Sequence, residues 1–180
     1  MRGPATVLCS LLFATALSAQ TPPSDDGVAV GWDISSFANN YGVGVRFDTA
    51  RFAHGRLQVQ VAGHIAWVDG VPVGEVESAW APYSLVRVGI VRSAPIGRLL
   101  RFYGGGGFAL ILPTHRVSED AARGGGYGLT GLEIAMPEGT RTRWFVELGG
   151  MGSGARADRL EHSPIYANGF TIGWGFRYRL

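Results

Sequence analysis

The chain has 180 residues, 28 glycines and a formal net charge of +2, and every one of its 16 basic residues is arginine. So small a charge, without a basic stripe that interleaves with stacking aromatics, argues against a nucleic-acid partner. No run of the sequence approaches the roughly eighteen apolar residues that indicate a membrane-spanning helix, although 46% of the residues are hydrophobic. The apolar side chains must therefore be accommodated by a structure other than a membrane-spanning helix.

Residues 1–19 predict a secretory signal peptide. Arg2 gives a cationic start, residues 5–17 are almost continuously apolar, and small residues follow at the expected cleavage site. Cys9 lies too early, and after too bulky a residue, to be a lipoprotein anchor. The only cysteine is therefore expected to leave with the signal, so that the mature protein holds no internal disulfide. We expect a signal peptide at 1–19 and a single barrel domain at 20–180.

The rest of the chain is organised in segments that alternate apolar with polar or small residues. A period of two predicts β-strands, because successive side chains leave a pleated backbone on opposite faces. The connections between the segments are alternately long and short, as in barrels with long outer loops and short periplasmic turns. The segments are 28–34, 41–48, 57–67, 84–91, 100–112, 126–136, 143–151 and 169–180. The expected outer loops are 35–40, 69–82, 113–125 and 154–168, and the expected inner turns are 49–55, 93–97 and 137–142.

The last segment shows the alternation most clearly. One face is wholly apolar or aromatic: Phe170, Ile172, Trp174, Phe176, Tyr178 and Leu180. The opposite face holds small and cationic residues: Thr171, Gly173, Gly175, Arg177 and Arg179. A tilted strand of about 9–11 residues can cross a bilayer, and lipid tolerates strands only when a closed barrel pairs every backbone group. The sequence therefore predicts an all-β fold, an eight-stranded antiparallel up-and-down transmembrane β-barrel.

The terminal strand also resembles the signal with which bacterial outer-membrane barrels end, an alternating strand with a terminal aromatic. The resemblance rests on Phe170, Trp174, Phe176 and Tyr178, with Leu180 in the terminal position. Over its full length the chain resembles the small OmpA- and OmpW-like outer-membrane barrels. The resemblance implies the bacterial outer membrane as location, its lipid as surroundings and the barrel assembly machinery as partner during biogenesis. It also implies a structural or surface-interaction role, with a surface ligand held by the outer loops and no cofactor.

The inward positions of the predicted strands are unusually rich in charge. An eight-stranded barrel has an interior just wide enough to be filled by side chains, and isolated charges there would be costly. Arginine suits pairing because its planar fork can hold a carboxylate through two hydrogen bonds. We expect a luminal charge network formed by Asp33, Arg46, Asp48, Arg87, Arg101, Glu133, Glu147, Arg177 and Arg179.

Other inward residues have simpler expectations. Glycines in the strands should leave room for large inward neighbours such as Tyr103 and Phe145. His64 is expected to be a luminal hydrogen-bonding residue, whereas His54 and His115 should lie in solvent. The histidines show no metal-ligand spacing.

Three features could indicate chemistry. Residues 104–107 are four glycines, but neither the Lys-Ser or Lys-Thr pair nor the helix of a phosphate-binding loop follows them. Glu133 and Glu147 on neighbouring strands could form an acid–base pair, although the surrounding arginines favour ion pairing. Glu161, His162 and Ser163 resemble the His and Ser arrangement of barrels that deacylate lipid A, but they lie together in a loop.

Three functional hypotheses follow. A closed structural or surface-interaction barrel without enzymatic activity is favoured. A narrow pore or a conduit for an apolar solute is the alternative. An enzyme that modifies lipid A comes third.

Overall fold

The computed structural model describes residues 27–38, 40–97, 99–136 and 141–180. The predicted signal peptide and the beginning of the barrel domain lie outside the described residues. Within them, no helix is long and apolar enough to cross a membrane.

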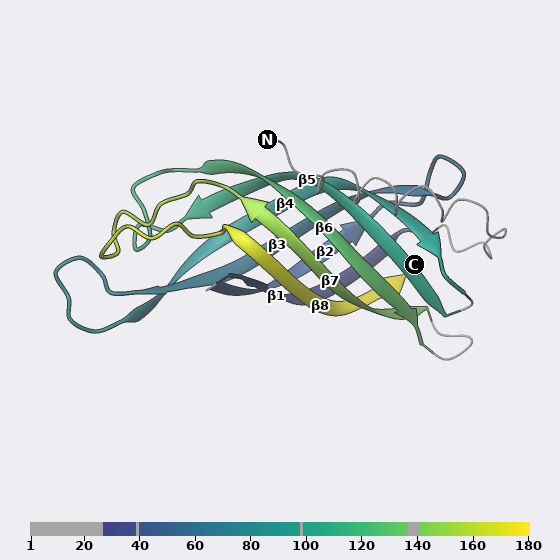
Figure 1. Cartoon of the computed structure of the whole chain (residues 1–180), viewed down its shortest axis with the longest axis horizontal. Helices are drawn as coiled ribbons and strands as arrows, with labels where there is room; N and C mark the ends of the chain where they lie inside the picture. Colours follow the sequence, from purple (N-terminus) through teal and green to yellow (C-terminus); the bar gives the residue numbers. More distant parts are fainter. Residues whose placement is uncertain (1–26, 39, 98, 137–140) are drawn as a thin grey trace, which may run out of the picture.

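Eight antiparallel strands form a closed barrel in which each strand pairs with its neighbours in sequence and β1 pairs with β8. Figure 1 shows the strands crossing the barrel at a common tilt. The predicted eight-stranded up-and-down topology is confirmed. The strands are β1 Ala29–Phe37, β2 Asn40–Asp48, β3 Leu57–Gly70, β4 Ala79–Pro95, β5 Leu100–Pro113, β6 Arg123–Ala135, β7 Thr142–Gly152 and β8 Gly169–Arg179.

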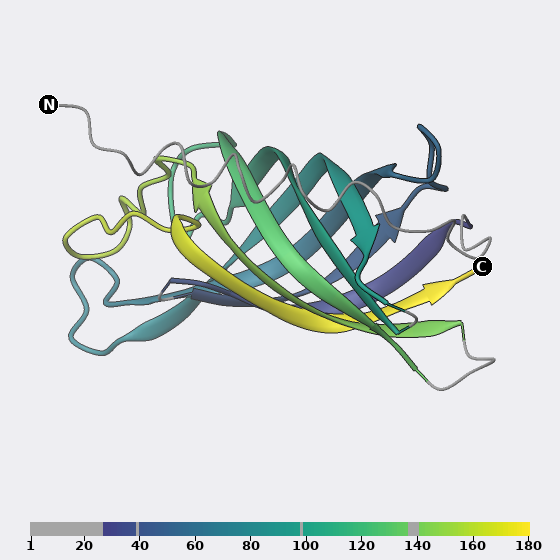
Figure 2. The same cartoon turned by 45° about the vertical axis from the view of Figure 1, so that its right-hand side comes forward.

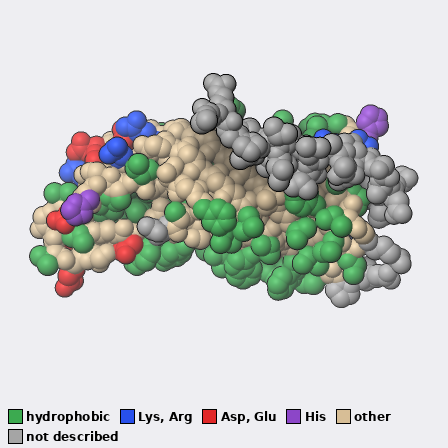
Figure 3. Space-filling model, in the orientation of Figure 1, with side chains coloured by type: hydrophobic (Ala, Val, Ile, Leu, Met, Phe, Trp, Pro, Cys, Tyr) green, Lys and Arg blue, Asp and Glu red, His purple; other side chains and the backbone are tan. Residues whose placement is uncertain are grey.

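The predicted alternation is confirmed in every strand. In β8, for example, Arg177 and Arg179 are buried, whereas Trp174 and Tyr178 are exposed on the outside. The exposed exterior residues are predominantly Val, Ile, Leu, Phe and Trp, and they form the hydrophobic band in Figure 3. An apolar exterior around a fully paired, edgeless sheet is what a bilayer requires.

The register gives the barrel its tilt. Partner residues traced from Thr142 through all eight strand pairs return to β7 at Gly152, ten residues further along. A barrel with such a stagger must tilt its strands relative to its axis. A line of cross-strand partners therefore climbs the wall from one end of the barrel to the other.

The predicted loop boundaries were wrong where strands continue past the apolar pattern. β4 begins at Ala79, inside the expected loop 69–82, and β1 and β2 extend until only residues 38–39 separate them. Beyond Tyr83, β4 pairs with β3 alone, which lets the strand contain Pro82, because proline is tolerated at a sheet edge. Backbone pairing thus extends into water, where nothing enforces the alternation of apolar side chains.

The two ends of the barrel differ in their connections. Connections 71–78, 114–122 and 153–168 gather at one end, and the chain terminus Leu180 lies at the other (Figures 1 and 2). Since outer-membrane barrels have short periplasmic turns and longer extracellular loops, the end with Leu180 is the periplasmic one.

Candidate functional site

The charge network predicted from the sequence lies inside the barrel, mainly in its periplasmic half. All nine of its residues point inward, and none has more than 7% of its surface exposed. Burial on this scale is tolerated only when the charges are paired and hydrogen-bonded. The pairs form two groups, one around Glu147 and Glu133 and the other around Asp33.

Glu147 is the centre of the first group. Arg46 Nη1 donates to Glu147 Oε1 at 2.6 Å and Arg46 Nη2 to Oε2 at 2.9 Å, a two-pronged contact between β2 and β7. Arg177 Nη2 lies 3.1 Å from Glu147 Oε1, and the Tyr103 hydroxyl donates to the same oxygen at 2.8 Å. Because β2 and β7 are not neighbours in the sheet, the Arg46–Glu147 contact spans the lumen.

Arg177 connects Glu147 to two further acids. Its Nη1 donates to Glu133 Oε2 at 3.0 Å, and its Nε lies 3.3 Å from Asp48 Oδ2. The other oxygen of Asp48 accepts a hydrogen bond from Gln60 Nε2 at 3.1 Å. One guanidinium group thus serves three carboxylates on three different strands.

Glu133 draws its remaining cations from the periplasmic end. Arg143 Nε lies 3.3 Å and Arg179 Nη2 3.7 Å from Glu133 Oε1. Arg101 is the cross-strand partner of Glu133 in the β5–β6 register. Arg143 was not assigned to the network from the sequence, although it has the same parity as Glu147 on β7 and therefore the same inward face.

Asp33 is the centre of the second group, nearer mid-barrel. Its Oδ2 accepts a hydrogen bond from Ser35 Oγ at 2.6 Å and lies 2.9 Å from His64 Nε2. Arg46 Nη2 at 3.4 Å and Arg87 Nη2 at 3.8 Å supply positive charge to the same oxygen. Since Arg46 also holds Glu147, it joins the two groups into one network.

Aromatic faces complete the packing of the arginines. The Arg46 guanidinium carbon lies 4.0 Å from the centroid of the Phe145 ring, and that of Arg177 lies 4.6 Å from both Phe145 and Tyr103. A Cβ added at Gly131 would lie 2.6 Å from Tyr103 Cζ, so this glycine makes room for the tyrosine ring, as expected. These cation–π contacts hold the guanidinium planes in place without exposing them to water.

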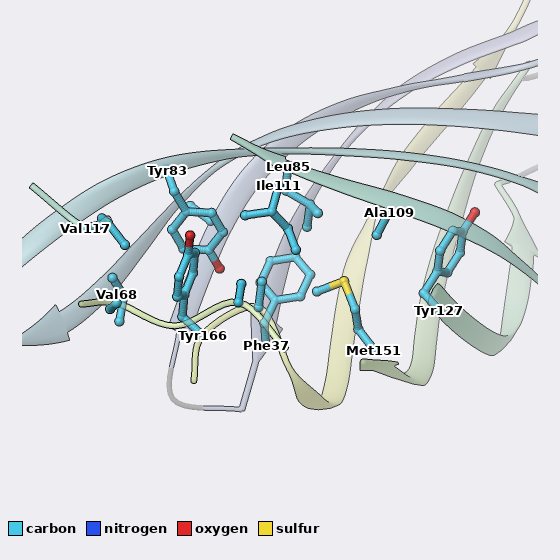
Figure 4. Packing of buried hydrophobic residues seen from close by; sticks show 14 of the residues in the cluster. Phe37, Val68, Tyr83, Leu85, Ala109, Ile111, Val117, Tyr127, Met151 and Tyr166 are labelled. Carbon is cyan, nitrogen blue, oxygen red and sulfur yellow. The ribbon is translucent and has the colours of Figure 1, made fainter. Parts of the chain in front are cut away.

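The extracellular half of the lumen is filled differently. A cluster of buried apolar side chains occupies it (Figure 4), and the Tyr83 and Tyr166 rings pack edge to face with centroids 4.9 Å apart. Tyr166 comes from loop 153–168, which also buries Leu160 and Ala157. This apolar plug was not predicted. Other large members of the cluster include Phe37, Val68, Leu85, Ile111, Val117, Tyr127 and Met151.

Backbone contacts hold loop 153–168 over the barrel mouth. Arg159 N donates to Val117 O at 3.2 Å and Val73 N to Arg159 O at 3.0 Å, which ties three outer loops together. Glu161 N donates to Val71 O at 2.8 Å in the same arrangement.

Electrostatic contacts outside the membrane accompany these backbone bonds. The hydrogen bond from Ser118 lowers the pKa of Asp158, and burial raises the pKa of Tyr166 to about 12. Both groups therefore keep their ordinary charge, negative and neutral respectively, at neutral pH.

The candidate features for chemistry named from the sequence do not form one site among the described residues. Glu161 and His162 are exposed on the outer loop, and His162 and Ser163 have φ angles of 63° and 43°. His54 and His115 are exposed, whereas His64 is buried beside Asp33. Among the described residues, no group of three or more His, Cys, Asp or Glu side chains could hold a metal ion.

Four residues of the expected assembly signal lie on the outer face of β8, and the fifth, Leu180, follows the strand directly. Phe176 packs between Trp32 and Trp144, with ring centroids 5.3 Å and 4.8 Å away. The other four are Phe170, Trp174, Tyr178 and Leu180, whose exposed fractions range from 43% to 65%. The contact between Phe176 and Trp32 joins the outer faces of β8 and β1, the last and first strands.

A closed eight-stranded sheet with an apolar exterior and a packed, charged interior defines a small transmembrane β-barrel of the outer-membrane class. Solved structures agree with this class. The N-terminal β-barrel domain of Pseudomonas aeruginosa OprF matches with a TM-score of 0.56 and 14% identity, over 86% of this chain and 98% of that chain. Yersinia pestis outer-membrane protein Ail, in a phospholipid bilayer nanodisc, matches with a TM-score of 0.53 and 11% identity, over 86% of this chain and 99% of that chain.

A de novo designed transmembrane β-barrel matches equally well, with a TM-score of 0.54 and 13% identity over 91% of this chain and 100% of the design. No protein-family model matches the sequence, and no curated protein sequence does either. The likeness therefore establishes the fold. A design and natural proteins share it, so the activity must be argued from the residues of this chain.

Proposed function

We propose that this protein is a closed outer-membrane barrel with a structural or surface-interaction role and no enzymatic activity. The observation that carries the proposal is the filling of the lumen from both ends. The Arg46–Glu147 contact spans the periplasmic half, and Tyr83 packs against Tyr166 in the extracellular half. With the lumen obstructed at both ends, the outer loops are the part of the molecule that can meet a ligand from outside the cell.

The outer loops present a surface suited to such contacts. Val73 and Val76 of loop 71–78 are 66% and 95% exposed, beside the acidic Glu75 and Glu77. The free energy of the system falls when a partner covers large apolar side chains that were in contact with water. The hydrogen bonds between loops give this surface a defined shape, which lowers the entropy lost on binding.

Proteoliposome swelling tests the closed lumen. Vesicles that contain the protein should swell in an isotonic solution of a small sugar no faster than empty vesicles, while vesicles with an open porin swell rapidly. Swelling at a rate close to that of the porin would support the pore. Lipid A mass spectra from cells with and without the protein should be identical, and a change in acyl chains that requires His162 would support the enzyme.

We also propose that Phe170, Trp174, Phe176, Tyr178 and Leu180 act as the assembly signal. Their common outward face is the support for this role. Replacing Phe176 and Tyr178 by alanine should lower the amount of folded barrel in cells, yet the purified variant should refold in detergent as well as the unmodified protein does. Equal losses in both settings would indicate a stability effect and no recognition by the assembly machinery.

A further inference from the structure

An open apolar groove runs across the outer wall of the barrel from β7 to β3. Its volume is about 920 Å³, and its lining includes Trp32, Val45, Val61, Gly63 and Thr142. A second hollow of about 530 Å³ shares Trp32, Val45 and Gly63 and continues the groove to β4. The β1–β8 side of this wall belongs to the hydrophobic band of Figure 3. The groove therefore lies in the part of the protein that faces lipid.

The groove follows the register of the sheet. Its lower row of cross-strand partners is Thr142, Tyr178, Val30, Phe47 and Val61, each paired with the next. Thr142 begins β7 at the periplasmic end, whereas Val61 lies well inside β3. Four strand spacings of about 4.8 Å at a tilt of about 35–45° raise the groove by roughly 11–14 Å. The hydrocarbon of one leaflet is roughly 15 Å thick, half of the bilayer core.

Gly63 lines both hollows and leaves open space above its backbone. A Cβ placed there would meet no atom within 4 Å, so the packing of the barrel does not require glycine at this position. Val45, its cross-strand partner, is 68% exposed, although most of the other apolar residues on this wall are less than half exposed. The protein itself therefore leaves this space open.

One side of the groove is lined by the aromatic residues Trp32, Phe176 and Tyr178. The Trp32 ring lies 5.3 Å from the Phe176 ring and 6.1 Å from the Trp174 ring. Aromatic side chains have few rotatable bonds, so an acyl chain that packs against them keeps its contacts better than one that packs against flexible side chains.

The lower end of the groove opens on a basic rim. Exposed Arg141 directly precedes Thr142 in the chain. The backbone N–H of Arg179 donates a hydrogen bond to the carbonyl oxygen of Arg141 at 3.0 Å. In sequence, the periplasmic connections carry four arginines and one acidic residue: Arg51, Arg56, Arg98, Glu138 and Arg141. The described outer loops carry six acidic residues and three arginines: Glu75, Glu77, Arg116, Glu119, Asp120, Arg156, Asp158, Arg159 and Glu161. An anionic headgroup is therefore favoured at the periplasmic end.

We propose that this groove holds one acyl chain of an anionic phospholipid of the periplasmic leaflet, with its phosphate at Arg141, Thr142 and Tyr178. Apolar contact along the groove selects the chain, and Arg141 selects the headgroup charge. The site lies on the outer wall, and Arg46 and Arg177 are the members of the luminal network that also belong to its lining.

Native mass spectrometry of the protein, released from detergent in the presence of phosphatidylglycerol or phosphatidylcholine, tests the site. The unmodified protein should retain one phosphatidylglycerol in preference to phosphatidylcholine. Gly63→Leu fills the groove and should weaken retention about tenfold, since the leucine occupies space that the chain would cover. Gly126→Leu is the matched control, because Gly126 faces outward on β6 with only one atom, at 3.8 Å, near its added Cβ.

Arg141→Gln should reduce the preference for phosphatidylglycerol about fivefold, the effect of one arginine near an anionic headgroup. Arg116→Gln, on an outer loop, should leave the preference unchanged. If Gly63→Leu does not fold, Val45→Phe fills the same hollow from β2 and should have the same effect. Equal retention by the groove-filling and control variants would overturn the proposal. So would retention of lipid A in place of phosphatidylglycerol, or a protein dimer in place of the lipid adduct.

Discussion

The two halves of the lumen are filled by different kinds of side chains. In the periplasmic half, strand side chains form ion pairs across the barrel, such as Arg46 with Glu147. In the extracellular half, loop 153–168 folds back and adds Leu160 and Tyr166 to apolar residues of the strands. The ion pairs of the periplasmic half require particular partners in particular orientations. The packing of the extracellular half requires that apolar side chains fill the available volume. The difference predicts that the two halves respond unequally to matched substitutions.

The largest effect is expected in the charged half. Glu147→Ala removes the carboxylate that Arg46 and Arg177 share and leaves Arg46 with Asp33 alone, at 3.4 Å. Removing one partner of a buried ion pair costs about 3–5 kcal/mol. Urea unfolding of the barrel in lipid vesicles measures the loss. Glu161→Ala on the exposed loop is the control and should leave the free energy of unfolding unchanged. Similar values for the two variants would mean that the network does not stabilise the barrel.

The next effect is expected in the apolar half. Leu85 is fully buried in the plug, and Leu85→Ala should cost about 2–5 kcal/mol through lost apolar contact and the cavity that remains. Leu85→Met, which nearly conserves volume, should cost less than about 1.5 kcal/mol. Equal losses for alanine and methionine in the same unfolding assay would argue against close packing at this position.

Surface contacts between the outer loops should matter less. The ion pair of Arg159 with Glu119 is exposed on both sides, so Arg159→Ala should change the free energy of unfolding by less than about 1 kcal/mol. The small effect should shrink further when salt is added, because exposed charges are screened. If Arg159→Ala lowered the free energy of unfolding as much as Glu147→Ala, ion pairs between the loops would be a main source of stability in the extracellular half.

The smallest effect is expected at Tyr166. Its hydroxyl is buried and has no hydrogen-bond partner among the described residues, so Tyr166→Phe removes a polar group that gains nothing from burial. The melting temperature should stay the same or rise. A clear fall would show that the hydroxyl has a partner, such as an ordered water.

These contrasts also explain how far the sequence could be interpreted. Alternation alone assigned Glu133, Glu147 and Arg177 to the interior, because a strand has only two faces. It could not pair Arg46 with Glu147, since the partners are 101 residues apart and meet only when the sheet closes with its particular stagger. The face of each residue can therefore be predicted from the sequence, but its partner across the lumen cannot.

The apolar plug had no comparable signal. Loop 153–168 lacks periodicity, so its buried residues cannot be recognised by spacing. Leu160 follows a charged residue and Tyr166 follows apolar Ile165, so no alternation marks them as buried. Their loop is fixed by backbone contacts, including those to residues 71, 73 and 117, which become visible only in the folded structure. The start of β4 at Ala79 was missed for a related reason, because strand pairing there continues in water.

The most direct test of the doubly closed lumen is the single-channel conductance of the unmodified protein in planar bilayers. The charged network and the apolar plug together predict no steady conductance above that of the bare bilayer. Steady, large current steps from the unmodified protein would contradict both closures and establish an open pore.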